Sequence, residues 1–514
     1  METTRKTNRG EKAIMSTVTG FLDELVTLVC SLILPRLILK AFGSQYNGLV
    51  SSITQFITVI ALMKAGIGGV TRVALYKPLA EKNSKEISAI VVQTERFMRK
   101  VAMIYVAFVL VVAVAYPLFI NREFEFLFSF TLILIISAST FSQYYFGLTY
   151  QMVINADQRR YVILIFNMAK TILNTVISVI LIKMGFGIHI VKLGGASVFV
   201  IAPIILNIYT KRYYHIDTSV TVKEDLIKQR WDAVGHEVAN FVHNNTDVMV
   251  LTVFTSLSTV SVYTVYHYVI TGIKKILLNF VDSFGSAFGN MYALGETELM
   301  HKNLNIFELI VFSLSSIIYS TTFVMLTPFV MIYTSGVTDA NYFQPLFGTI
   351  IALAGAFNCF RVPYHAIVVT AAGHFKETKK GAYLEAVINI VVSILCVVRY
   401  GLIGVAIGTL CATAFRTVQY VTYLSRHILY RKVSLFLKHL FIVLGIFGLT
   451  YYLSTLYMGQ INTVLAWISY AVLTTLISFV LTVVTDLLFY RDDSRALFKK
   501  IMAIFRRRAK SISK

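Results

Sequence analysis

The sequence predicts an all-α integral membrane protein with about 14 transmembrane helices. Hydrophobic residues make up 56% of the 514 residues and charged residues only 14%, so the chain has more apolar side chain than a soluble core absorbs. The apolar runs are about 20 residues long, which suits membrane-spanning helices, whereas a barrel would need alternating segments of about 10 residues. An internal repeat with an offset of about 212 to 216 residues predicts two six-helix lobes followed by two C-terminal helices.

The repeat rests on residues that punctuate the apolar runs rather than on the runs themselves. Its matched pairs are Phe42 with Phe254, Tyr150 with Tyr364, Asn174 with Asn389, Ser178 with Ser393, and Gly194 with Gly408. Because six spans separate the two copies, both lobes should insert the same way up and be related by a pseudo-two-fold axis along the membrane normal. This plan is typical of transporters that rock two helical bundles about a central site.

The first of the fourteen predicted spans could be a signal peptide or a retained helix. It carries Asp23 and Glu24 and lacks a small-residue cleavage site, so we expect a retained helix rather than a signal peptide. The spans are predicted near residues 14–40, 46–70, 100–119, 127–150, 161–183, 189–209, 236–256, 260–283, 304–330, 345–372, 381–399, 402–424, 439–457 and 462–489. The corresponding parts are an N-terminal lobe (1–209), a cytoplasmic inter-lobe loop (210–235), a C-terminal lobe (236–424), two extra helices (425–489) and a basic cytoplasmic tail (490–514).

Basic residues are distributed unevenly between the two sets of loops. The two tails and the loops after even-numbered spans hold 35 of the 47 lysine and arginine residues, whereas the opposite loops hold about five. Loops rich in lysine and arginine stay in the cytoplasm, so we expect both termini there, in a multi-pass protein of the cell membrane. The formal net charge of +21 is scattered over short loops, which indicates contact with anionic membrane lipids and not with nucleic acid.

Three stretches carry a resemblance to a known family. They are FGSQYNGLVSSITQF with AGIGGVTRVALYKPLA in the first two spans, NNTDVMVLTVFTSLSTVSVYTVYHYV across the seventh and eighth, and TAAGHFKETKKGAYLEAVINIVVSI at the tenth and eleventh. The chain resembles the Wzx-type polysaccharide flippases of the multidrug/oligosaccharidyl-lipid/polysaccharide exporter superfamily. The resemblance implies two six-helix lobes around a cavity that faces each side of the membrane in turn. It also implies a substrate, an undecaprenyl-pyrophosphate-linked oligosaccharide moved from the inner to the outer leaflet, and polysaccharide polymerase machinery as a candidate partner.

Cations at membrane depth are the candidate substrate-binding residues, because burying a charge in a bilayer is costly and needs a reason. Lys64 and Lys274 each lie about six residues, or roughly 9 Å, from the predicted cytoplasmic end of a helix, where they could meet an entering pyrophosphate. The predicted binding residues are Lys64, Lys274, Lys275, Arg361 and Arg36, and the other cations at this depth are Lys170 and Arg416. The alternative is that these side chains only reach the membrane interface.

Acidic side chains at membrane depth are candidates for binding a coupling ion. Asp247 lies near the middle of the seventh span and follows Asn244, Asn245 and Thr246, so this polar string predicts a helix face that lines a cavity. The alternative is hydrogen bonding between helices, or pairing of Asp247 with a cation. The other acids are Asp23 and Glu24, which are further coupling-ion candidates, and Glu237; the histidines that could carry protons are His236, His243 and His267.

The sequence predicts no catalytic residue, cofactor or metal. It contains no G-x-x-x-x-G-K-[ST] string, so nothing indicates ATP hydrolysis by this chain. The cysteines lie inside apolar runs without the spacing of a metal site or a disulfide framework; they are Cys30, Cys359, Cys396 and Cys411. Transport would then depend on an ion gradient, on removal of product, or on a partner.

Two other functions remain open at this stage. A drug or cation antiporter of the same superfamily should favour acids in its pore, whereas the cations at membrane depth outnumber the acids by seven to about four. A membrane-embedded glycan polymerase would normally need a catalytic loop outside the membrane, and the predicted outer loops are short. Both alternatives therefore rank below the flippase.

The charge distribution generates a topology prediction. Reporter fusions after Asn341 and after Gln460 should be active outside the cytoplasm, and a fusion at Ser511 should be active inside, because lysine-rich and arginine-rich loops stay cytoplasmic. The measurement is reporter activity for each fusion, with a fusion in the loop after Lys211 as a cytoplasmic control. Reversal of any of the three signals would contradict the fourteen-span topology.

Overall fold

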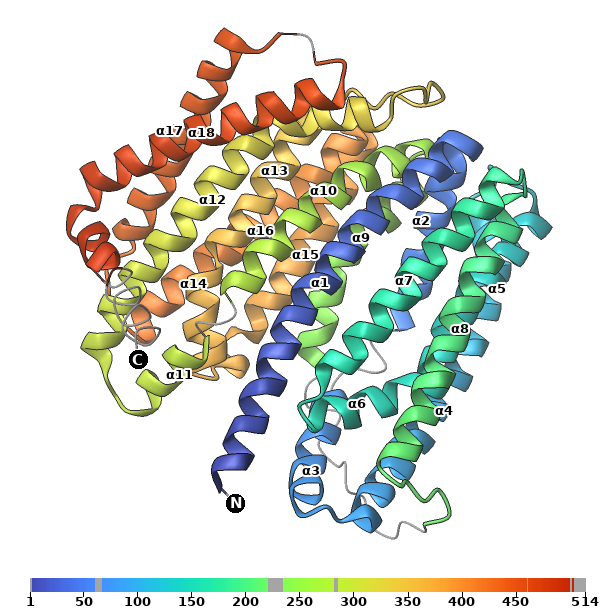
Figure 1. Ribbon diagram of the computed structural model, residues 1–514. Helices are drawn as coiled ribbons and strands as arrows, with labels where there is room; N and C mark the ends of the chain where they lie inside the picture. The colour runs from blue at the N-terminus through green and yellow to red at the C-terminus, as the bar shows by residue number, and fades with distance from the viewer. Residues whose placement is uncertain are drawn as a thin grey trace. The chain divides into compact units, whose positions relative to one another are not determined.

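The computed structural model describes residues 2–60, 67–220, 234–281, 285–459, 461–499 and 502, which fold as helices with short connections and form no β-strand (Figure 1). The helices in chain order are α1 (Glu2–Phe42), α2 (Ser44–Thr58), α3 (Ile67–Glu81), α4 (Ser84–Ala115), η2 (Tyr116–Ile120), α5 (Phe126–Ser142), η3 (Gln143–Gly147), α6 (Leu148–Ala156), α7 (Arg160–Lys183), α8 (Ile188–Tyr213), α9 (Val234–Phe254), α10 (Leu257–Val281), α11 (Gly285–Ala293), α12 (Thr297–Tyr333), α13 (Pro345–Phe360), α14 (Val362–His365), η6 (Ala366–Ala371), α15 (Phe375–Tyr400), α16 (Leu402–His427), α17 (Ser434–Tyr457) and α18 (Val464–Phe489).

The predicted all-α membrane fold is confirmed. Within the described ranges, 11 helices are long and apolar enough to cross a membrane. Of the three other predicted spans, 236–256 and 260–283 fall on α9 and α10, whereas 46–70 covers α2 and the first residues of α3, with residues 61–66 outside the described ranges. Helices satisfy their own backbone hydrogen bonds, which is why a chain this apolar adopts them throughout its membrane-spanning length.

The chain divides into two compact units. Unit 1 comprises residues 1–261 and 336–340, and unit 2 comprises residues 262–335 and 341–514. The division therefore falls inside α10 and at the tip of the connection between α12 and α13. The lobes predicted from the repeat are defined by sequence and not by contacts, and they stay a prediction.

Unit 1 is held together by long helices that pack side by side. Helix α7 packs against both α1 and α8, and α5 packs against α4 and α8. Its core contains Leu49, Ile53, Met98 and Tyr105. Polar side chains inside this core pair with one another, since lipid offers them no partner: Tyr116 Oη donates to Ser52 Oγ at 2.8 Å, as does Thr252 Oγ1.

In each half of the sequence repeat, a glycine lies close to a neighbouring helix. In unit 1, a Cβ added to Gly195 on α8 would collide with the Asn174 side chain on α7. In unit 2, a Cβ added to Gly408 on α16 would collide with Ser393 on α15. Gly195 is one residue beyond Gly194, the residue matched to Gly408, so the two contacts use neighbouring and not identical positions of the repeat; in both, a glycine permits close approach of the helices.

Two helix N-termini in unit 1 are each capped by a carboxylate from a loop of the other repeat copy. Ser44, the first residue of α2, donates from its backbone N to Asp339 Oδ2 and from its Oγ to Asp339 Oδ1, both at 2.6 Å. Leu257, the first residue of α10, donates its backbone N to Glu123 Oε1 at 2.8 Å. Each acid satisfies a backbone N–H that the helix leaves free and interacts favourably with the helix dipole. Glu123 and Asp339 are about 216 residues apart, which agrees with the offset of the repeat.

Unit 2 is built around α12, which packs against α13, α17 and α18. Phe312 of α12 stacks on Phe360 of α13 with ring centroids 4.9 Å apart. Helix α18 is tied to α12 by polar contacts as well: Ser313 Oγ donates to Asp486 Oδ2 at 2.6 Å, and Trp467 Nε1 donates to the Met325 carbonyl at 3.1 Å. The extra helices are therefore an integral part of this unit.

A buried ion pair fastens the connection between α16 and α17 to the same helix. Arg431 Nη2 lies 2.8 Å from Glu308 Oε2, and Glu308 is fully buried in α12. His439 Nε2 lies 4.0 Å from the same oxygen, and its ring stacks on Tyr490 at 4.5 Å. Because a buried carboxylate needs a partner, Glu308 fixes the position at which α17 begins.

The caps at α2 and α10 predict that removal of a capping acid destabilises the fold more than removal of an acid that caps no helix. Asp339→Ala should lower the free energy of unfolding by about 1 kcal/mol, since Ser44 then loses its acceptor. Glu296→Ala is the matched control, because Glu296 precedes α12 but its side chain makes no capping hydrogen bond. The measurement is the midpoint of thermal unfolding in detergent for each variant and the unmodified chain. Equal midpoints for the two variants would contradict the capping role of Asp339.

Candidate functional site

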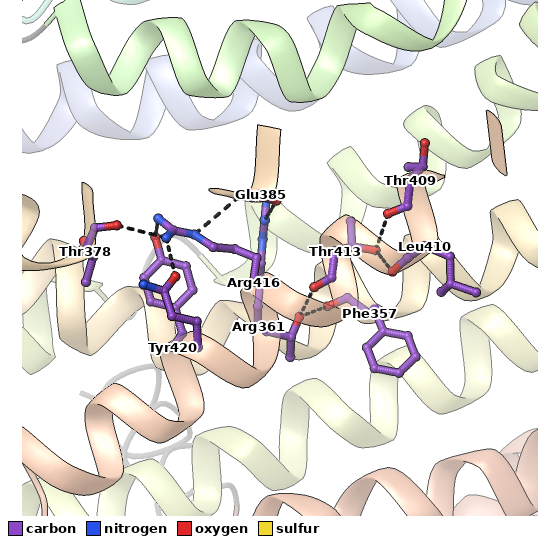
Figure 2. Close-up of polar contacts among 11 residues, drawn as sticks. Phe357, Arg361, Thr378, Glu385, Thr409, Leu410, Thr413, Arg416 and Tyr420 are labelled. Atoms are coloured by element: carbon purple, nitrogen blue, oxygen red, sulfur yellow. Dashed lines mark hydrogen bonds and ion pairs between the residues drawn. The ribbon is translucent and has the colours of Figure 1, made fainter. Parts of the chain in front are cut away.

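A cluster of charged side chains lies inside unit 2 around Arg416 of α16. Only 4% of Arg416 is exposed. Its Nη2 donates to Tyr420 Oη at 2.6 Å, and its Nη1 donates to the Thr378 carbonyl at 3.0 Å and to Gln419 Oε1 at 2.5 Å. Its guanidinium also lies over the Tyr420 ring, 4.2 Å from the centroid. Figure 2 shows this side chain extended between Thr378 and Glu385.

Glu385 of α15 joins Arg416 to a second arginine. Glu385 Oε2 lies 3.4 Å from Arg416 Nε, and Glu385 Oε1 accepts from Arg361 Nη1 at 2.9 Å (Figure 2). Arg361 ends α13, and Pro363 at the start of α14 has no N–H with which to continue that helix.

The three groups lie at one depth along their helices. Arg361 precedes the end of η6 at Ala371, Glu385 follows the start of α15 at Phe375, and Arg416 precedes the end of α16. At a rise of about 1.5 Å per residue, each lies about three helical turns, or roughly 15 Å, from the same end of its span. A charge at such a depth needs a partner in the protein or in a ligand.

Lys274 of α10 adds a further positive charge to this cluster. It lies within electrostatic range of Arg361, Glu385 and Cys359, and among the described residues it forms no hydrogen bond and no ion pair. His365 lies near both arginines, with its ring 5.5 Å from that of Tyr420. Three cations therefore surround one carboxylate, which leaves the cluster with a net charge of +2 and Lys274 available to an anionic ligand.

The structure brings together two of the predicted binding residues, Lys274 and Arg361. Lys64 lies outside the described residues. Lys275 follows Lys274 on α10 but is exposed, and Arg36 is half-buried on α1 beside Pro35 in unit 1. Lys274 and Arg361 thus belong to one charged cluster in unit 2, with Arg416 as a third cation, and their binding of a diphosphate stays a prediction.

The predicted coupling-ion residues all belong to unit 1. Asp247 is buried on α9, and Asp23 and Glu24 are half-buried on α1. Asp23 lies within electrostatic range of Lys170 on α7, so one predicted acid and one predicted cation face each other across two packed helices. The His236, Glu237, His243 and Asn244 side chains lie outside what the structure describes.

The side chains of the remaining polar candidates, Asn245 and His267, contact residues of their own helices. Asn245 Nδ2 donates to the Phe241 carbonyl one turn earlier, at 2.7 Å. His267 stacks on Tyr263 one turn earlier on α10, with ring centroids 5.3 Å apart. Among the described residues, no three His, Cys, Asp or Glu side chains are grouped as a metal site requires.

Sequence reasoning missed Glu385, the residue that joins the two arginines. It lies close to the start of the predicted span 381–399, where an acid is easily taken for an interfacial one. The signal was nevertheless present: Arg361 and Arg416 occupy the predicted tenth and twelfth spans, and Glu385 is the only acid in spans ten to twelve. Two buried arginines require a nearby acceptor, and this observation points to Glu385.

Three solved structures similar to this chain are a flippase and two transporters. "Lipid II flippase MurJ, inward closed conformation" has a TM-score of 0.70 and 14% identity over 93% of this chain and 99% of that one. An inward-facing multidrug resistance MATE family transporter of the MOP superfamily has a TM-score of 0.61 and 14% identity, covering 82% and 99%. The Vibrio cholerae MATE transporter VcmN in its bent form has a TM-score of 0.53 and 15% identity, covering 84% and 99%.

The chain has the fold of MOP superfamily transporters. The similarity covers nearly the full length of the solved chains, so it concerns the whole arrangement of helices and not a single bundle. No protein-family model matches the sequence, and no curated protein is similar to it at a significant level. A charged cluster at membrane depth that contains more cations than acids is a candidate for contact with an anionic ligand, because unpaired charge is costly there.

The cluster predicts a strong dependence of stability on Glu385. Glu385→Gln should lower the free energy of unfolding by roughly 3 to 5 kcal/mol, because Arg361 and Arg416 would then face each other without a carboxylate. Glu377→Gln is the matched control, since Glu377 is exposed on the same helix. Thermal unfolding in detergent measures both. If Arg361→Met, Glu385→Met and Arg416→Met combined, which removes both arginines together with the carboxylate, were no more stable than Glu385→Gln alone, the pairing would not explain the loss.

Proposed function

We propose that this chain is a flippase that moves a polyprenyl-diphosphate-linked oligosaccharide from the inner to the outer leaflet for surface polysaccharide assembly. The observation that carries the proposal is the net charge of +2 in the cluster around Glu385. A diphosphate that links a lipid to a sugar carries one negative charge on each phosphate, so the two charges are complementary. The wider fold supports transport, since the solved structures described above are a flippase and transporters.

The side chains of the cluster suit different parts of this task. Arg416 is held by four partners and is buried, so it supplies a fixed positive field rather than a mobile contact. Arg361 uses one nitrogen on Glu385 and is about one-fifth exposed, which leaves other donors for a phosphate oxygen. Lys274 supplies a point charge with rotatable donors, which tolerates a phosphate whose attached sugar varies.

An apolar groove in the same unit suits the lipid part of the substrate. A cavity of about 910 Å³ lies among α11, α12, α18 and the residues that follow α18. Its walls include Phe288, Phe307, Phe479 and Phe498, with Ser313 and Asp486 as a polar pair already bonded to each other. Isoprenoid chains bind such surfaces through apolar contact alone, without hydrogen-bonding groups.

The proposal includes the topology and the drive of transport. Both termini lie in the cytoplasm. The substrate enters from the inner leaflet, and the polysaccharide polymerase machinery lies on the outer side of the membrane. Asp247, Asp23 and Glu24 are the proposed sites of ion coupling, because they are acids at membrane depth. The cavity enclosed by the predicted lobes, 1–209 and 236–424, would open to each side of the membrane in turn.

A drug or cation antiporter is the second candidate, and the similarity to MATE transporters favours it. Such a protein needs an acidic site for a cationic substrate. The best-formed membrane-depth cluster here has the opposite sign, since its only acid is already shared by two arginines. Uptake of a cationic dye by vesicles that contain the chain would favour this candidate over the flippase.

Replacement of the cations tests the flippase directly. Lys274→Ala, Arg361→Ala or Lys64→Ala should each weaken binding of a polyprenyl diphosphate about 10- to 150-fold, because a charge-assisted phosphate contact contributes roughly 1.5 to 3 kcal/mol. Flipping is measured in proteoliposomes with a fluorescent polyprenyl diphosphate oligosaccharide, and insertion is checked by protease protection. Lys64→Arg should retain part of the activity, since charge matters more than geometry at this position.

The matched control is Lys376→Ala, because Lys376 is an exposed lysine near the start of α15. It should leave flipping unchanged. Normal flipping by Lys274→Ala and Arg361→Ala would show that these side chains do not contact the substrate, and the electrostatic mechanism would then be wrong.

A further inference from the structure

A small polar pocket in unit 1 lies between the middle parts of α7, α8 and the bent α5–η3–α6 segment. Its volume is about 50 Å³. Five polar side chains line it: Ser139, Gln143, Gln151, Asn167 and Lys170. Helices α5, α7 and α8 are otherwise apolar enough to span a membrane, so these side chains form a polar site at membrane depth.

The three amides of this pocket have unused hydrogen-bonding groups. Among the described residues, the side chains of Gln143, Gln151 and Asn167 form no hydrogen bond. These amides are half-buried, and each has a carbonyl acceptor and two N–H donors that can bond to water or to a ligand. The pocket is large enough for a few water molecules or for one polar substituent of a ligand. Three such amides facing one space therefore indicate a ligand that both donates and accepts hydrogen bonds.

The charge of the pocket differs from that of the cluster in unit 2. Its single cation, Lys170, lies within electrostatic range of Asp23 on α1, which balances it. The Lys170 ammonium also lies 5.5 Å from the centre of the Phe199 ring. A balanced pair of charges gives no net attraction for a diphosphate. The ligand should accordingly be uncharged.

The pocket also has an apolar side that narrows the class of ligand. Phe166 and Phe199 line it beside the amides. A sugar ring presents hydroxyl or acetamido groups at its edge and C–H groups on its faces, so it needs amides and aromatic rings together. A volume of about 50 Å³ admits one edge of a sugar and not the whole ring.

We propose that this pocket binds a hydroxyl or acetamido edge of the glycan carried by the lipid, and thereby selects among oligosaccharides. The proposal rests on the proposed flippase function and extends it from the diphosphate to the sugar. Gln143 and Asn167 supply the selective hydrogen bonds, and Phe166 and Phe199 contact the C–H face.

The test compares two lipids on the full-length chain in lipid nanodiscs. The probes are undecaprenyl diphosphate and the same lipid carrying an oligosaccharide that contains N-acetylhexosamine, and the measurement is the dissociation constant by fluorescence titration. The unmodified chain should bind the glycosylated lipid about 3- to 10-fold more tightly, the effect of one or two neutral hydrogen bonds. Gln143→Leu and Asn167→Leu should each remove most of this preference and leave binding of undecaprenyl diphosphate unchanged, which also shows that the variants are folded.

Arg361→Ala serves as the contrasting variant, because it should weaken both lipids by the same factor. The sugar site would be overturned if Gln143→Leu and Asn167→Leu kept the full preference, or if they weakened both lipids equally. If the unmodified chain bound neither lipid, the flippase function itself would fail, and the sugar site with it. Binding of undecaprenyl diphosphate alone, without preference, would remove only the sugar site.

Discussion

A polar group inside the membrane must find its partner within the protein, and this constraint governs the whole molecule. The ion pairs of Glu385 with Arg361 and Arg416 depend on it. The backbone meets this constraint by folding as helices. The side chains meet it in pairs: Tyr116 with Ser52, Ser313 with Asp486, and Glu308 with Arg431. At Lys274, which among the described residues forms no hydrogen bond and no ion pair, the pairing is incomplete.

The same constraint connects the helices in a specific way. Apolar side chains pack almost equally well against lipid and against each other, so apolar contact alone does not select one neighbour for a helix. Polar pairs do select it, because each group has few partners of the right kind at the right depth. Helix α18 illustrates this point, since Asp486 and Trp467 bond to Ser313 and Met325 of α12. Each helix is thus assigned to its neighbours by a few bonds.

The fold was largely predictable from the sequence, whereas the site was predictable only in part. Run length and composition predict helices, and these depend on local properties of one segment. Arg361 and Lys274 could be named because a cation inside an apolar run is visible in one segment too. Glu385 could not be recognised as a partner from its own surroundings, since its role depends on Arg361 and Arg416, which belong to two other spans. The amides Gln143 and Asn167 were overlooked for the same reason, because uncharged side chains attract notice only when they face each other across helices.

The exchanged caps at α2 and α10 have a consequence for the order in which the molecule is assembled. Ser44 and its acceptor Asp339 are separated by 295 residues, whereas Leu257 follows its acceptor Glu123 by 134. A ribosome adds about 5 to 20 residues per second, so Asp339 is made roughly 15 to 60 seconds after Ser44. Helix α2 therefore waits through most of synthesis with its first turn uncapped, while α10 finds its carboxylate already made. The N-terminal half becomes complete only when the connection before α13 has been translated. Its folding therefore ends late in the synthesis of the chain.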